Sequence, residues 1–160
     1  NKLSVQFPLS PLRVLYTKGG TQPAACLLRD DRPVIDHMLY WMAPSSEDEG
    51  RYLVAVLNSE TARARAAQFQ ARGQFGARHF DKVMFNLPIP RFSADNPLHR
   101  ALAAAGAEAE ETAARLVLSE AVKFQQARRQ VRTELTETGI AATIDRLVAE
   151  RLDTGKPPED

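Results

Sequence analysis

Three prolines between residues 88 and 97 divide this 160-residue chain into two parts with different patterns. Pro88 and Pro90 have no backbone N–H to donate to a sheet, so a strand predicted over residues 83–87 ends there. Asn96-Pro97 then combines a good N-cap residue with proline at the first helical position. We therefore expect a mixed α/β part over residues 1–92 and a helical part after it.

Short stretches of β-forming residues, separated by turn signals, characterise the first part. Residues 13–16 precede Gly19-Gly20, where paired glycines suit a turn with positive φ. Residues 24–28 precede a second turn signal at 29–33. Residues 34–42 are rich in β-formers and predict a longer third strand. Together the stretches predict a small, mainly antiparallel sheet.

A helical period follows the polar loop at residues 44–50. The apolar residues that recur on one helical face are Tyr52, Leu53, Val56 and Leu57. After Asn58-Ser59 the period restarts, which predicts a second helix or a bent continuation of the first. Arg63 and Arg65 fall on the outward side of this second helical stretch.

The second part, residues 93–152, has the apolar spacing of packed helices. One seam steps by three or four residues through Leu98, Leu102, Ala105, Ala109, Ala113 and Leu116. Its expected partner is the stretch from Glu120 onward, whose apolar face carries Phe124, Ala127, Val131 and Leu135. Gly139 interrupts that stretch, and a last amphipathic helix runs over 140–152. Residues 153–160 are charged, contain Gly155 and two prolines, and predict a disordered tail.

The predicted fold class is therefore α+β. It combines a small antiparallel sheet and one or two packed helices with a C-terminal helical hairpin or small bundle.

The single cysteine and the lack of long apolar runs exclude several classes of protein. Cys26 alone cannot form an internal disulfide or a cysteine-based zinc site, and its apolar neighbours predict a small buried side chain. No apolar run approaches the roughly 18 residues of a membrane span. No signal-peptide pattern opens the chain. We expect a cytoplasmic protein without a membrane partner.

Catalytic and metal-binding motifs are not found in this sequence. The histidines at 37, 79 and 99 lack the further ligands of a metal site. We expect His37, on the third strand, and His99, in the first turn of a helix, to make ordinary hydrogen bonds. Ser59 lacks a Gly-x-Ser-x-Gly elbow, and Lys18-Gly19-Gly20 lacks the spacing of a phosphate loop. No catalytic, cofactor-binding or metal-binding residue is assigned.

Positive charge is concentrated between residues 61 and 92, although the net charge of the chain is only +1. Six basic residues stand there against Asp81 as the only acid, a net of +5. Arginine pairs with phosphate or guanine, exposed aromatics stack on bases, and glycines allow a close approach. Phe69 and Phe85 are assigned to the core. The candidate DNA-binding residues are Arg63, Arg65, Arg72, Gln74, Phe75, Arg78 and Lys82.

Three stretches, in this order, resemble the target-recognition region of adenine-N6 DNA methyltransferases, in particular type II restriction-modification enzymes in which recognition follows methylation on one polypeptide. They are residues 52–59 (YLVAVLNS), 72–82 (RGQFGARHFDK) and 87–90 (LPIP). Residues 144–148 (IDRLV) are similar to a helix near the end of many such proteins.

The resemblance implies a specificity domain that grips duplex DNA opposite a catalytic domain. The family's Asn/Asp-Pro-Pro-aromatic motif and its glycine-bearing loop for S-adenosylmethionine do not occur here, and Asn96-Pro97 begins a helix instead. The resemblance therefore places the methyltransferase domain, with S-adenosylmethionine, upstream on the same polypeptide and outside this chain. Whether an endonuclease activity accompanies it stays open.

Two other hypotheses stay beside DNA recognition. In the first, the chain is a protein-interaction or scaffold module that docks a partner through the helices over 98–116 and 140–152, and the basic loop is incidental. The second, an enzyme complete in itself, is disfavoured because no nucleophile, acid–base pair or metal cluster is found.

Overall fold

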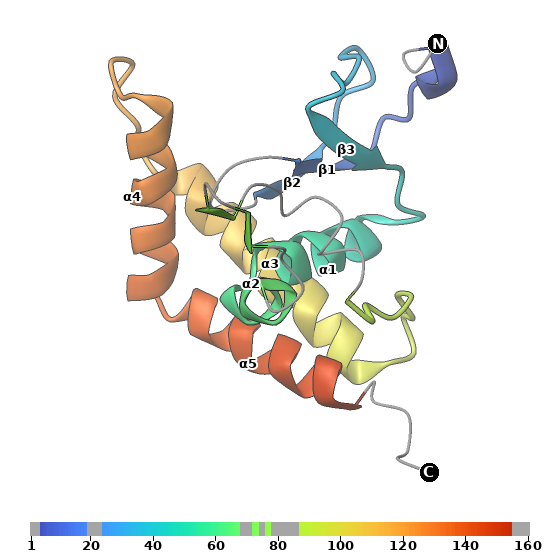
Figure 1. Ribbon diagram of the computed structural model, residues 1–160, viewed down its shortest axis with the longest axis vertical. Coiled ribbons are helices and arrows are strands. Elements are labelled where there is room, and N and C mark those ends of the chain that lie inside the picture. The colour runs from blue at the N-terminus through green and yellow to red at the C-terminus, as the bar shows by residue number, and fades with distance from the viewer. Residues whose placement is uncertain (1–3, 19–23, 68–71, 74–75, 78–86, 155–160) are drawn as a thin grey trace.

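The computed structural model describes residues 4–18, 24–67, 72–73, 76–77 and 87–154 (Figure 1). A three-stranded antiparallel sheet packs against helices, and further helices follow at the C-terminal end. The predicted α+β class is confirmed. A short 3₁₀ helix, η1 (Ser4–Gln6), precedes the sheet. No helix in these ranges is long and apolar enough to cross a membrane.

The sheet has β1 (Arg13–Thr17) at its centre, between β2 (Ala25–Leu28) and β3 (Leu39–Met42). Leu15 of β1 stands opposite Cys26 on one side and Trp41 on the other. Because side chains alternate along a strand, Val14 and Tyr16 point to the other face and are buried. β2 and β3 are therefore the edge strands.

The third strand is shorter than predicted, since residues 34–38 lie outside it. Asp36 accepts hydrogen bonds from Met38 N through its side chain (3.0 Å) and from Leu39 N through its carbonyl (3.1 Å). Gln6 bonds both the N–H and the carbonyl of Ile35. These turn and side-chain hydrogen bonds take the place of the strand-to-strand bonds that a β-strand would need, so the prediction of a strand over 34–38 is wrong.

Two consecutive helices follow the sheet, as predicted. α1 (Glu47–Asn58) begins at Ser46, whose Oγ accepts from Glu49 N at 3.1 Å. Three acidic residues occupy its first turn, where their negative charges interact favourably with the helix dipole. α2 (Glu60–Ala67) buries Ala62 and Ala66.

The second part of the chain forms three helices: α3 (Pro97–Arg115), α4 (Phe124–Glu137) and α5 (Ile140–Thr154). The Asn96 side chain caps α3 by accepting from Leu98 N and His99 N, as the sequence predicts. Gly139, with φ of 78°, turns the chain between α4 and α5, a conformation that favours glycine. α5 extends two residues into the predicted tail, and residues 155–160 lie outside the described ranges.

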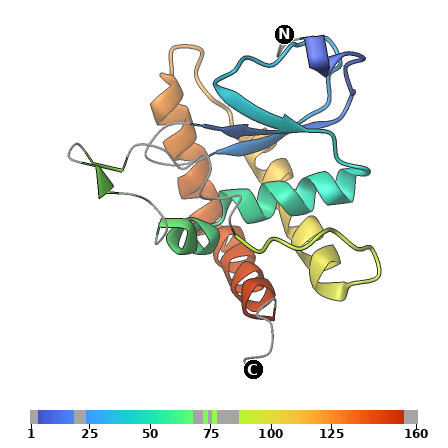
Figure 2. The same cartoon turned by 45° about the vertical axis from the view of Figure 1, so that its right-hand side comes forward.

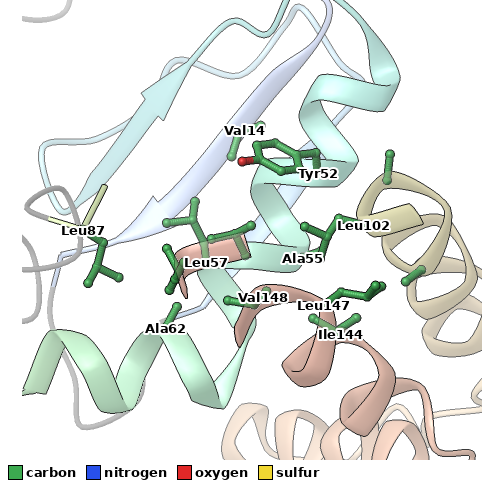
Figure 3. Packing of buried hydrophobic residues seen from close by; sticks show 14 of the residues in the cluster. Val14, Tyr52, Ala55, Leu57, Ala62, Leu87, Leu102, Ile144, Leu147 and Val148 are labelled. Atoms are coloured by element: carbon green, nitrogen blue, oxygen red, sulfur yellow. The ribbon is translucent and has the colours of Figure 1, made fainter. Parts of the chain in front are cut away.

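One hydrophobic core joins both parts of the chain. Figure 3 shows Val14 of β1 and Tyr52 of α1 on one side of this core, with Leu102 of α3 and Val148 of α5 nearby. α4 contributes no buried residue. The predicted packing of its apolar face against α3 is therefore incomplete.

Candidate nucleic-acid interface

The Asn58-Ser59 pair builds the junction between α1 and α2. The Asn58 side chain accepts a hydrogen bond from Ala25 N and donates one to Ala25 O, both at 2.9 Å, so it ties the end of α1 to strand β2. Ser59 Oγ donates to Val56 O at 2.8 Å and accepts from Ala62 N at 3.0 Å. One residue thus ends α1 and caps α2. These contacts fix the direction in which α2 leaves the core.

A second anchor holds the stretch Leu87-Pro88-Ile89-Pro90. Leu87 is buried in the core, and Ile89 packs against it. The Tyr52 hydroxyl donates to the Pro90 carbonyl at 3.0 Å. Pro90 is thereby held on α1, the same helix that carries the Asn58 junction.

The two anchors frame the segment that contains all seven candidate DNA-binding residues. Within it, β4 (Arg72–Gly73) and β5 (Gly76–Ala77) pair antiparallel, with Arg72 opposite Ala77 and Gly73 opposite Gly76. Figure 2 shows that this hairpin projects to one side of the sheet and helices. Arg72 is therefore placed on a projection that starts and ends at the core.

Gln74, Phe75, Arg78 and Lys82 lie outside the residues that the structure describes, as do Phe69, His79 and Phe85. The predicted strand over 83–87 is also outside them, except for Leu87. Their assignments stay predictions.

Arg63 and Arg65 lie on α2, away from its buried alanines, and each has a carboxylate partner. Arg63 pairs with Glu60 one turn earlier, with Nε 2.7 Å from Oε2. This pair raises the pKa of Arg63 and lowers that of Glu60. Arg65 Nη2 lies 2.6 Å from Asp153 Oδ1 at the end of α5. A phosphate at either arginine would have to replace or join a carboxylate.

Two further arginines, which are not among the predicted site residues, share a groove with Arg63. Arg128 and Arg132 are one turn apart on α4 and line the same groove as Arg63. The pKa of Arg132 is lowered, first by loss of solvation and then by repulsion from Arg128 and Arg63. Their spacing of four residues places them on one helical face, which is the signal in the sequence that could have found them.

Two side chains are more exposed than the sequence suggests. Cys26 is exposed rather than buried, because β2 is an edge strand and this side chain points away from the core. The groove walls and the charge of Glu110 still raise the pKa of its thiol. His37 is exposed in the turn before β3, not on a half-buried strand. Among the residues described, no group of three His, Cys, Asp or Glu side chains could hold a metal ion.

His99 is buried beside the second anchor. Its ring centroid lies 4.9 Å from that of Tyr52 and 6.0 Å from that of Phe92. Nδ1 accepts a hydrogen bond from Ser93 N at 2.9 Å, so the neutral ring carries its proton on Nε2. Burial, and then the charge of Arg151, lower the pKa of His99. The folded state therefore favours neutral histidine.

This preference predicts a loss of stability in mild acid. The unfolded chain takes up a proton near the ordinary histidine pKa of about 6.5, while folded His99 does so only at lower pH. The contribution of neutral His99 to the free energy of unfolding is complete above a pH of about 6.5. Below this pH it falls by at most about 1.4 kcal/mol per pH unit. Urea unfolding at pH 7.5 and 5.5 measures this loss. We expect His99→Asn, which keeps an acceptor near Ser93 N, to reduce it.

His37→Asn is the matched control, because His37 is exposed. The described carboxylates whose pKa values are lowered titrate in more acidic solution and do not interfere; they are Asp30, Glu47, Glu60 and Glu110. Equal pH dependence in wild type and His99→Asn would contradict the assignment.

Comparisons with protein-family models, with curated proteins and with solved structures find no match for this chain.

Proposed function

We propose that this chain is the DNA sequence-recognition region of an adenine-N6 methyltransferase. It would bind duplex DNA and position a catalytic domain that lies outside the chain and uses S-adenosylmethionine. The observation that carries the proposal is the frame around the basic segment. The stretches that resemble the methyltransferase family, around Asn58-Ser59 and over residues 87–90, are those that tie both ends of this segment to the core.

The frame suits recognition because binding residues are effective when a rigid scaffold positions the loop that carries them. The two ends of the segment are held by α1, which restricts where the residues between them can meet a ligand. Arg72 on β4 and Arg78 beyond β5 are the side chains we assign first to phosphates or base edges.

The carboxylate partners of Arg63 and Arg65 are compatible with phosphate binding. Both ion pairs lie at the surface, where such pairs contribute only about 0–1 kcal/mol. A DNA phosphate can replace a surface carboxylate at small cost. We therefore assign these two arginines to the outer part of the interface, with Gln74, Phe75 and Lys82 nearer the groove of the DNA.

The proposal predicts duplex binding that weakens steeply with salt. Each phosphate contact contributes a slope of about −0.9 to log affinity against log salt. We expect Arg72→Ala and Arg78→Ala each to weaken binding and to make the slope shallower by about this amount if the lost contact is to a phosphate. Fluorescence anisotropy with a labelled duplex at several salt concentrations measures both quantities.

Arg32→Ala is the matched control, because Arg32 is highly exposed on the turn after β2 and outside the basic segment. It should leave affinity and slope unchanged. The proposal is contradicted by no duplex binding at low salt, or by binding that neither Arg72→Ala nor Arg78→Ala affects. Selection from a pool of random duplexes distinguishes recognition from general affinity, since recognition enriches one sequence.

The second candidate function is a protein-interaction module, and one observation favours it. The apolar faces first considered for docking are largely used inside this chain, since Leu102 of α3 and Val148 of α5 lie in the core. The apolar face of α4 is different, because none of its residues is buried.

A further inference from the structure

A groove of about 840 Å³ runs between α4 and the body of the protein. Strand β2 and helices α1, α2, α3 and α5 form its other walls. Small side chains line much of it, including Ala55 of α1, Ala109 and Ala113 of α3, and Ala127 of α4. Small residues allow a close approach by another backbone.

The α4 wall of the groove is an apolar helical face without a full partner. Phe124, Ala127, Val131 and Leu135 all line the groove, and no residue of α4 is buried. Phe124 has 69% of its surface exposed. Amphipathic helices bury such a face in a globular protein, so α4 presents a surface that another element can cover.

Four arginines and three carboxylates line this groove, so its formal charge is +1. Two of the carboxylates are paired with arginines, Glu60 with Arg63 and Glu110 with Arg29, and Asp145 accepts a hydrogen bond from Thr61 N at 2.9 Å. Arg132 lies exposed beside Arg128, and none of the ion pairs between described residues includes it. Arg128 and Arg63 repel the charge of Arg132 and Glu60 attracts it; the repulsion lowers the pKa of Arg132 more than Glu60 raises it, so an added negative charge is favoured there.

We propose that this groove docks an acidic amphipathic α-helix of a partner protein. Its apolar stripe would lie on the small residues and on the α4 face, and its carboxylates would meet Arg128 and Arg132. The α4 lining extends from Phe124 to Thr136, about 18 Å along the helix axis, which matches three turns of a bound helix. Anchors at i, i+3, i+4 and i+7 are the usual pattern of helix-in-groove binding.

The apolar floor favours a helix over nucleic acid, because it offers DNA phosphates no partner. The proposal does not depend on DNA binding by the basic segment. Arg132 is therefore the side chain that distinguishes the two surfaces, since it lies on α4 and outside that segment.

The test uses a synthetic 18-residue helix with leucines at the stated spacing and glutamates beside them. One matched control peptide has lysines in place of the glutamates, and another has the leucine spacing disrupted. Cys26 lines the groove and is the only cysteine, so its alkylation by iodoacetamide reports occupancy directly. We expect the acidic helix to slow alkylation of Cys26 and both control peptides to have much weaker effects.

Two pairs of variants on α4 make the test specific. We expect Val131→Glu to weaken binding of the acidic helix by about tenfold or more, because it places a carboxylate in the apolar groove. Thr133→Glu is its control, since Thr133 is exposed and does not line this groove. Arg132→Glu should remove the preference for the acidic over the basic helix, whereas Arg129→Glu should retain it. Circular dichroism verifies folding, and substitution of unburied residues should preserve it.

Several outcomes would overturn the proposal. Equal binding of acidic and basic helices, or binding that ignores Val131→Glu, excludes the proposed contacts. If decanoate protects Cys26 and the acidic helix does not, the groove binds a small amphiphile. If only a DNA duplex protects Cys26, the groove binds nucleic acid. A dimer that Val131→Glu dissociates assigns the groove to a second copy of the chain.

Discussion

Replacing Tyr52 by alanine is expected to lower the free energy of unfolding by about 3–5 kcal/mol, as for other large buried aromatics. Tyr52 has no exposed surface, and its ring centroid lies 5.6 Å from that of Phe92 and 4.9 Å from that of His99. Its removal leaves a cavity between α1 and α3 and also frees the Pro90 carbonyl. Urea unfolding followed by far-UV circular dichroism measures the loss.

Tyr52→Phe separates the ring from the hydroxyl. The ring stays packed, while the 3.0 Å hydrogen bond to Pro90 O and the polar contact of the hydroxyl with Arg151 are lost, so we expect a cost of about 0.5–1.5 kcal/mol. Tyr52→Phe should also increase protease cleavage between residues 67 and 87 if Pro90 anchors that segment. A loss below 1 kcal/mol for Tyr52→Ala, or equal losses for the two variants, would contradict the described packing.

Gly106→Ala is expected to destabilise the protein by about 1–3 kcal/mol, the usual cost of overpacking. A Cβ at this position would lie 2.6 Å from the carbonyl oxygen of Arg51, so α1 and α3 would have to move apart. Alanine favours a helix interior over glycine by about 1 kcal/mol, but this gain is smaller than the cost of separating two packed helices. Thermal and urea unfolding show whether the substitution lowers or raises the free energy of unfolding overall.

Two other substitutions test that explanation. Ala104→Gly, at an exposed position on the same helix, should cost about 1 kcal/mol through helix propensity alone. Gly50→Ala places its Cβ 2.6 Å from Leu27 Cδ1, the end of a flexible side chain that can rotate away. We therefore expect Gly50→Ala to cost less than Gly106→Ala. A stabilising Gly106→Ala would show that α1 and α3 can separate freely.

Local signals in the sequence were sufficient for most of the helical structure. Apolar periodicity predicted all five α-helices, α4 from four residues too early, and Asn96-Pro97 located the start of α3, because these signals depend on neighbours within a few residues. The third strand was predicted too long. β-Propensity favoured a strand at Ile35. Instead, hydrogen bonds with the distant Gln6 and a turn at Asp36 hold this stretch in a non-strand conformation.

The candidate site could be predicted only in part. Composition identified the basic segment, and its pattern supported the choice of Arg63, Arg65 and Arg72. The frame that holds the segment depends on the Asn58–Ala25 and Tyr52–Pro90 contacts, which join residues more than 30 positions apart. The groove that Arg128 and Arg132 line together with Arg63 likewise requires the packing of α4 on α3 and α5.

The sequence by itself determined the α+β class, the division near residues 88–97, the helix boundaries set by capping residues, and the concentration of positive charge between residues 61 and 92. Each follows from short-range stereochemistry or from composition. Only the tertiary structure decided that Cys26 faces a groove, that the basic segment has two fixed ends, and that α4 retains an open apolar face. Those features depend on which surfaces stay uncovered after the core has formed. A local sequence pattern cannot predict this, because the core joins residues that are distant in the sequence.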